Sequence, residues 1–154
     1  MIRVRIYGCK DLILRARFRR CVFFYLSRLL PKQKNILIRI FFSDSLHEDH
    51  DMIGSCLVDD HPSNRRHKKF TIHLDTSLNF IQMLVTLAHE LIHVKQYATM
   101  QLSYDYKNSE NTIWNKNVYG PEAFSYKECP WEIEAKKFEK ILSRELLKNK
   151  TVWE

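Results

Sequence analysis

The apolar positions between residues 78 and 97 recur at the three- and four-residue spacing of an α-helix. They are Ile81, Leu84, Leu87, Ala88, Leu91 and Val94. Residues at this spacing share one face of a helix, and the segment contains neither Gly nor Pro to interrupt it. The pattern therefore predicts a buried helix, with Thr76 or Ser77 as its N-cap.

Two further helices are predicted, one near each end of the chain. Residues 12–30 carry an apolar stripe at helical spacing, and Pro31 is expected to end that helix. Residues 130–147 begin with Pro130, which is favoured in the first turn of a helix, and continue with strong helix-forming residues.

Three segments have the composition or alternation of β-strands. Residues 35–42 are rich in β-branched side chains, residues 53–59 form a shorter apolar run, and residues 69–75 alternate between apolar and polar positions. Residues 3–7 alternate as well, which predicts either a short strand or an extended arm.

The order of these elements predicts one α+β domain over residues 1–154, with a small sheet of about three strands. A chain of this length can bury a hydrophobic core. We expect strand 69–75 to lie beside the central helix and to present an exposed edge to which a substrate peptide can add as a further strand. Residues 101–129 are expected to form a long loop that walls the cleft.

The central helix contains the motif His89-Glu90-Leu91-Ile92-His93. Because His89 and His93 are four residues apart, both imidazoles can bind one zinc ion from the same helix face. Zinc would lower the pKa of a bound water to about 7, and Glu90 would act as general base and then as general acid. The motif therefore predicts a zinc-dependent peptidase.

Catalytic zinc usually has a third protein ligand. The metzincin pattern is excluded, because the position that needs its last His is Thr99, and no His follows His93. A carboxylate must therefore complete the set, and Glu132 and Glu134 are favoured because they open a helix. The other candidates are Glu110, Glu122 and Glu128.

Two motifs give the chain a resemblance to the gluzincin peptidases. Residues 89–96 (HELIHVKQ) and residues 130–135 (PWEIEA), preceded by Tyr126, closely resemble a group of small metallopeptidases common in phage and large-virus genomes. The helix–sheet–helix order is similar to that of minigluzincins. The resemblance implies a zincin-like fold and points to Glu132 as the third ligand, three residues before the small Ala135. Many relatives carry Asp after that small residue, where this chain has Lys136.

A peptidase also needs a hydrogen-bond donor for the oxyanion that forms on the scissile carbonyl. We predict Tyr126 for this role, because it lies shortly before the helix that carries Glu132 and fits the family pattern. The alternatives are Tyr97, Tyr104, Tyr106 and Tyr119.

Other polar residues are predicted to have lesser roles. Residues 47–51 could hold a second metal, and His73 could face a substrate at the sheet edge. His61 and His67 are expected on the surface or on a strand. The four cysteines form no CxxC pair, and we expect them to be reduced and mostly buried.

The formal charge of +7 suggests a second class of function. Basic clusters within residues 3–20 and 65–69 could hold nucleic acid or an acidic protein, so the alternative to a peptidase is a catalytically weak, zinc-containing binding module. The sequence shows no signal-peptide pattern and no run of 18 apolar residues. We therefore expect a cytoplasmic protein, in the host cell if the chain is viral, with no membrane span.

Overall fold

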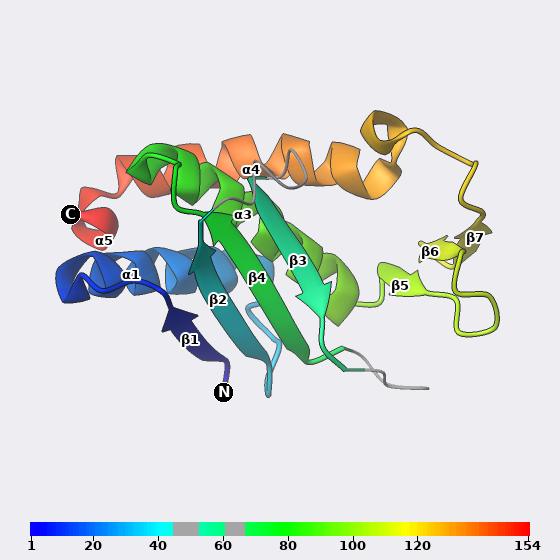
Figure 1. Ribbon diagram of the computed structural model, residues 1–154, viewed down its shortest axis with the longest axis horizontal. Coiled ribbons are helices and arrows are strands. Elements are labelled where there is room, and N and C mark those ends of the chain that lie inside the picture. Colours follow the sequence, from blue (N-terminus) through cyan, green and yellow to red (C-terminus); the bar gives the residue numbers. More distant parts are fainter. Residues whose placement is uncertain (45–52, 61–66) are drawn as a thin grey trace.

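A computed structural model describes residues 1–44, 53–60 and 67–154. Its larger sheet is built from strands that follow the spatial order β1 (Arg3–Tyr7), β2 (Leu37–Ser43), β4 (Lys69–Asp75) and β3 (Gly54–Val58) (Figure 1). Strand β2 runs parallel to both β1 and β4, whereas β3 is antiparallel to β4.

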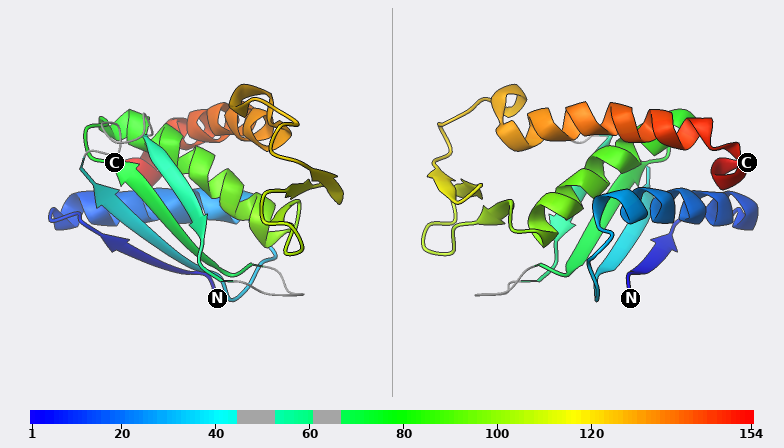
Figure 2. Two further views of the ribbon diagram at one scale, coloured as in Figure 1. Left: turned by 45° about the vertical axis from the view of Figure 1, so that its right-hand side comes forward. Right: turned by 180° about the vertical axis from the view of Figure 1, so that it is seen from behind.

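One face of this sheet is covered by helices, and the other faces the viewer in Figure 1. The helices are α1 (Leu12–Leu29), α3 (Phe80–Ala98), α4 (Pro130–Lys148) and the short α5 (Lys150–Trp153). Helices α1 and α3 lie against the sheet, and α4 packs on α3 (Figure 2). The core lies between these layers, where Phe18, Tyr25, Ile40, Ile72 and Leu87 are fully buried. The expected α+β class is confirmed.

The sheet differs from the expectation in two respects. Residues 3–7 form a full strand, because Arg3 to Tyr7 pair in parallel with Leu37 to Phe41, so the described sheet has four strands rather than about three. The expected exposed edge at residues 69–75 is wrong, because β4 lies between β2 and β3. Alternation shows that one face of a strand is buried, but it does not show how many neighbours the strand has. Strand β3 is the end strand on this side of the described sheet.

The segment from residue 101 to 129 is more regular than the predicted loop. It contains a three-stranded antiparallel sheet, β5 (Leu102–Tyr104), β6 (Thr112–Trp114) and β7 (Asn117–Tyr119), followed by a 3₁₀ turn, η1 (Tyr126–Glu128). Trp114 and Phe124 contact the ring of Trp131, with centroid distances of 6.1 and 6.2 Å. These aromatic contacts hold the small sheet against the start of α4.

Helix α3 begins later than the sequence pattern suggested, and a different residue caps it. The side chain of Asn79 accepts a hydrogen bond from the Gln82 amide, and the Gln82 side chain accepts one from the Asn79 amide. This reciprocal capping box replaces the predicted cap at Thr76 or Ser77. The hydroxyl of Thr76 instead donates to Asp44, the residue that follows β2.

None of the helices in the described residues is both long and apolar enough to cross a membrane. The four cysteines are free thiols; Cys21 and Cys129 are buried, and Cys9 and Cys56 are partly exposed.

The cap at Asn79 can be tested by unfolding. We expect Asn79→Ala to lower the free energy of unfolding by about 1 kcal/mol, because the backbone amide of Gln82 loses the side-chain oxygen that accepts its hydrogen bond. Urea denaturation with a circular dichroism readout measures this change. Ser77→Ala is the matched control and should leave the stability unchanged, whereas an equal loss in both variants would contradict the assigned cap.

Candidate metal centre

The structure brings His89, His93 and Glu132 together between α3 and α4. The Nε2 atoms of the two histidines are 3.1 Å apart. Glu132 Oε2 lies 3.2 Å from His89 Nε2, and Glu132 Oε1 lies 3.3 Å from His93 Nε2. The two histidines are one helical turn apart on α3, and the carboxylate enters from the first turn of α4.

These distances fit the donor set of a small divalent cation. Zinc bonds imidazole nitrogen and carboxylate oxygen at about 2.0–2.2 Å, so two ligand atoms of a tetrahedral site are roughly 3.3 Å apart. Two imidazoles and one carboxylate also match the three protein ligands of many catalytic zinc sites. The group His89, His93 and Glu132 could therefore hold a metal ion.

Gln96 fixes the orientation of the His93 ring. The Gln96 Nε2 atom donates to the Trp131 carbonyl at 3.0 Å, which turns the amide oxygen Oε1 toward His93 Nδ1 at 2.8 Å. Because that oxygen can only accept, His93 Nδ1 must carry the proton, which leaves Nε2 available as a ligand. The same side chain joins the two helices, because Trp131 lies on α4.

Glu139 has the corresponding role for His89. Its Oε2 lies 2.8 Å from His89 Nδ1, so the carboxylate accepts a hydrogen bond from the Nδ1–H group and directs Nε2 toward His93 and Glu132. Lys136, one turn before Glu139 on α4, is exposed. Glu139 therefore provides a carboxylate partner one turn further along α4.

The carboxylates around the site hold a positive charge in place. Burial by itself lowers the pKa of His89, but hydrogen bonds to Glu132 and Glu139 outweigh it and raise that pKa to about 10. Burial acts to raise the pKa of Glu132, but hydrogen bonds with His89 and His93 keep it well below its usual range. The pair Glu132 and Glu139 therefore favours a cation at this point, and a bound metal would replace a proton there.

Glu90 is buried next to this group, with 6% of its surface exposed. Burial raises the pKa of its carboxyl to about 7, although His93 and His89 act to lower it. Such a group can accept and return a proton near neutral pH.

Gly54, the first residue of β3, makes room for Glu90. A Cβ atom at this position would lie 2.9 Å from Glu90 Oε1 and 2.6 Å from the Thr86 methyl carbon. Strand β3 can therefore approach α3 this closely only without a side chain at residue 54.

Tyr126 and Glu134 lie in different surroundings. The Tyr126 hydroxyl donates to Glu132 Oε2 at 3.0 Å, and burial and the neighbouring Glu132 raise the pKa of this phenol, so it stays protonated. Glu134 does not belong to the group formed by His89, His93 and Glu132, and it pairs with Lys95 Nζ at 2.8 Å. Of the two carboxylates that the sequence left open, Glu132 is therefore the one beside His89 and His93.

The other predicted residues do not join this group. His73 lies on the interior strand β4, where its ring stacks on Phe41. His67 is buried rather than superficial, with Nδ1 3.2 Å from the Asp60 carbonyl. Residues 47–51 and His61 lie outside the described residues.

Sequence reasoning missed the supporting roles of Gln96 and Glu139, although each had a signal. Gln96 follows His93 by three residues and therefore lies on the same face of α3. Glu139 follows Glu132 by seven residues, which is two helical turns along the same face of α4. The sequence did not show which residues of α4 lie beside which residues of α3.

Comparison of the chain with protein-family models, curated proteins and solved structures gives no match. The candidate metal centre is therefore defined by the geometry of the chain's own residues.

The ligand set can be tested by zinc content. Wild type is expected to hold one equivalent of zinc by elemental analysis, and Glu132→Ala to lose it, because only two ligands remain. Glu134→Ala is the matched control two residues further along α4, and it should retain zinc while losing its contact with Lys95. Retention of zinc in Glu132→Ala together with its loss in Glu134→Ala would refute the assigned set.

The close approach of β3 to α3 can be tested at Gly54. We expect Gly54→Ala to lower the free energy of unfolding by about 1–3 kcal/mol, because the new methyl group overlaps Thr86 and Glu90. Adding Thr86→Ser, which removes the clashing methyl carbon, should restore part of the loss in urea denaturation. A Gly54→Ala protein as stable as wild type would show that β3 and α3 are further apart than this structure places them.

Proposed function

We propose that this protein is a zinc-dependent peptidase with a zincin-like fold of the gluzincin type. The observation that carries the proposal is the convergence of three ligand atoms from His89, His93 and Glu132 beside the buried carboxylate of Glu90. A structural metal site would need no buried acid next to its ligands, whereas hydrolysis requires one.

Zinc is the metal that suits these residues best. Imidazole and carboxylate ligands at tetrahedral spacing favour zinc, and three protein ligands leave a fourth position open for water or substrate. Bound zinc would polarise the scissile carbonyl and make a water acidic enough to be deprotonated near neutral pH.

Glu90 supplies the proton transfers. Its burial keeps its pKa near 7, so the carboxylate can take a proton from the attacking water and then return one to the leaving amine. The geometry leaves this task to Glu90, because Glu132 and Glu139 are occupied by the two histidines.

Tyr126 supplies the donor for the oxyanion. Its hydroxyl already reaches the site, where it donates to Glu132, and it stays protonated because its pKa is raised. The side chain is largely exposed, so the ring can turn from the carboxylate toward a substrate carbonyl.

The substrate peptide is proposed to run along β3 rather than along β4. Strand β3 is the end strand of the described sheet, and Gly54 lies directly against Glu90. A peptide that adds to this edge as a further strand would pass in front of the catalytic carboxylate.

The test of the proposal is Glu90→Gln. We expect this variant to keep its zinc, because Glu90 is not a ligand, and to cleave a peptide library at least about a hundredfold more slowly than wild type, because it cannot transfer protons. The measurement is kcat/KM on the best library substrate, with zinc content determined in the same preparation.

Glu122→Gln is the matched control, because it makes the same change at an exposed position. It should leave kcat/KM unchanged. Cleavage by Glu90→Gln at the wild-type rate, or a zinc-loaded wild type that cleaves no member of the library, would refute the proposed activity.

A further inference from the structure

The positive charge of the chain is concentrated in its first 43 residues. This segment contains eleven Arg and Lys and one Asp, a formal charge of +10, whereas the whole chain carries +7, so the remaining 111 residues carry −3. The segment forms β1, α1 and β2. This basic segment therefore lies toward the β1 end of the sheet, opposite β3 and the candidate metal centre (Figure 1).

Part of this charge stabilises the fold. Arg17 and Arg20 donate to the carbonyls of Trp153 and Val152 in α5, and Arg28 pairs with Glu145. These arginines therefore have partners within the chain.

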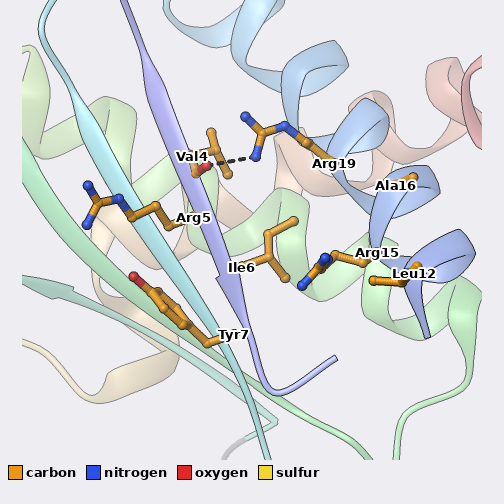
Figure 3. Close-up of a pocket in the computed structure, with 8 residues that line it drawn as sticks. All are labelled: Val4, Arg5, Ile6, Tyr7, Leu12, Arg15, Ala16 and Arg19. Atoms are coloured by element: carbon orange, nitrogen blue, oxygen red, sulfur yellow. Dashed lines mark hydrogen bonds between the residues drawn. The ribbon is translucent and has the colours of Figure 1, made fainter. Parts of the chain in front are cut away.

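A second group of arginines lines a cavity of about 620 Å³ between β1 and α1 (Figure 3). Arg15 and Arg19 project from α1 on the helix side of β1, whereas the side chains of Arg5 and Tyr7 project to the opposite side of that strand (Figure 3). Arg19 Nη1 donates to the Val4 carbonyl at 2.9 Å, which holds its guanidinium at the cavity. Among the described residues, no carboxylate forms an ion pair with any of these three arginines.

A row of stacked aromatic rings lies on the open face of the sheet and ends at strand β1. Tyr7, Phe41 and His73 are register partners on β1, β2 and β4, and their rings stack. The centroid distances are 4.7 Å from Tyr7 to Phe41 and 5.4 Å from Phe41 to His73, with interplanar angles of 14° and 20°. Tyr7 ends the row at the edge strand, where it is 39% exposed.

A basic row lies beside the aromatic row. Arg5 and Arg39 are register partners two residues before Tyr7 and Phe41, and Arg39 is paired with Asp59 while Arg5 is exposed. The linear sequence does not show the alternation of basic and aromatic residues that a single-strand binder needs. The parallel pairing of β1 with β2 creates it across the strands.

We propose that the β1 edge and the adjoining open face bind single-stranded nucleic acid. Arg5, Arg15 and Arg19 contact successive phosphates, and an unpaired base continues the ring stack on the outer side of Tyr7. A duplex offers the same phosphates but keeps its bases inside, and an acidic peptide has no base for the ring. Arginines on both sides of the edge strand β1, with a stacking ring beside Arg5 on the open face, therefore favour a single strand over either alternative.

The experiment is fluorescence anisotropy of the zinc-loaded, full-length protein with a labelled single strand of about 15 nucleotides, titrated between about 50 and 200 mM salt. The double variant Arg5→Ala/Arg15→Ala is expected to raise Kd at least tenfold and to reduce the slope of log Kd against log salt by about 1.4, since each lost phosphate contact removes about 0.7. The control Lys136→Ala/Lys140→Ala on α4 removes the same charge and should change Kd less than twofold.

Substitutions at Tyr7 distinguish the contribution of base stacking to binding from the contribution of charge. Tyr7→Leu is expected to weaken single-strand binding by roughly five- to a hundredfold with an unchanged salt slope, whereas Tyr7→Phe keeps the ring and retains binding. Circular dichroism and zinc content report whether each variant is folded.

Three outcomes would overturn the proposal. The first is an equal loss in the Lys136→Ala/Lys140→Ala control, which would show general attraction to charge. The second is full binding by Tyr7→Leu together with equally tight binding of a duplex or of polyglutamate, which would indicate a duplex or an acidic protein as the partner. The third is no binding of the single strand at the lowest salt.

Discussion

The packing of α4 on α3 is the contact on which the candidate metal centre depends. Helix α3 by itself presents two histidines and a glutamate, which is too few ligands to hold a metal firmly. The carboxylate of Glu132 lies beside the two histidines because the first turn of α4 packs next to them. One turn further along α4, Ala135 is small enough to be fully buried. Gln96 then joins the helices, since it bonds both His93 and the Trp131 carbonyl.

This contact also explains the electrostatics of the site. Glu132 and Glu139 both come from α4, and together they place two carboxylates against one imidazole, that of His89. Negative charge held in a largely buried position between helices favours a bound cation. Glu90 remains outside these pairs, and its burial between α3 and β3 keeps its pKa near 7. The same packing therefore separates the residues that would hold a metal from the residue that would move protons.

The two ends of the sheet differ in the chemistry they present. The β3 end lies against the candidate metal centre, where Gly54 lets the strand approach the helix. The β1 end carries arginines and the end of an aromatic row. Because the four described strands separate these surfaces, a ligand at one end would not cover the other. A chain of 154 residues therefore has room for two independent binding surfaces.

The sequence by itself determined the features that depend on local spacing. The central helix and the placement of His89, Glu90 and His93 on it follow from periodicities of three and four residues, and the C-terminal helix follows from Pro130 and the helix-forming residues after it. Strand β4 was predicted with its observed bounds, because alternation is also local. The N-cap at Asn79 was missed, although it too is a local signal, because Thr76 and Ser77 stood nearby as competing candidates.

Only the tertiary structure decided how these elements meet. The choice between Glu132 and Glu134 depended on the rotation of α4 about its axis, which is set by packing against α3. Three further features depend on residues that are distant in sequence. They are the hydrogen bond from His89 to Glu139, the interior position of β4 in the sheet, and the stacking of Tyr7 on Phe41. The spacing of residues along a chain gives the face of an element on which each one lies. Which neighbouring element that face packs against is determined by burial of the whole core, and the residues that form the core are spread over the entire chain.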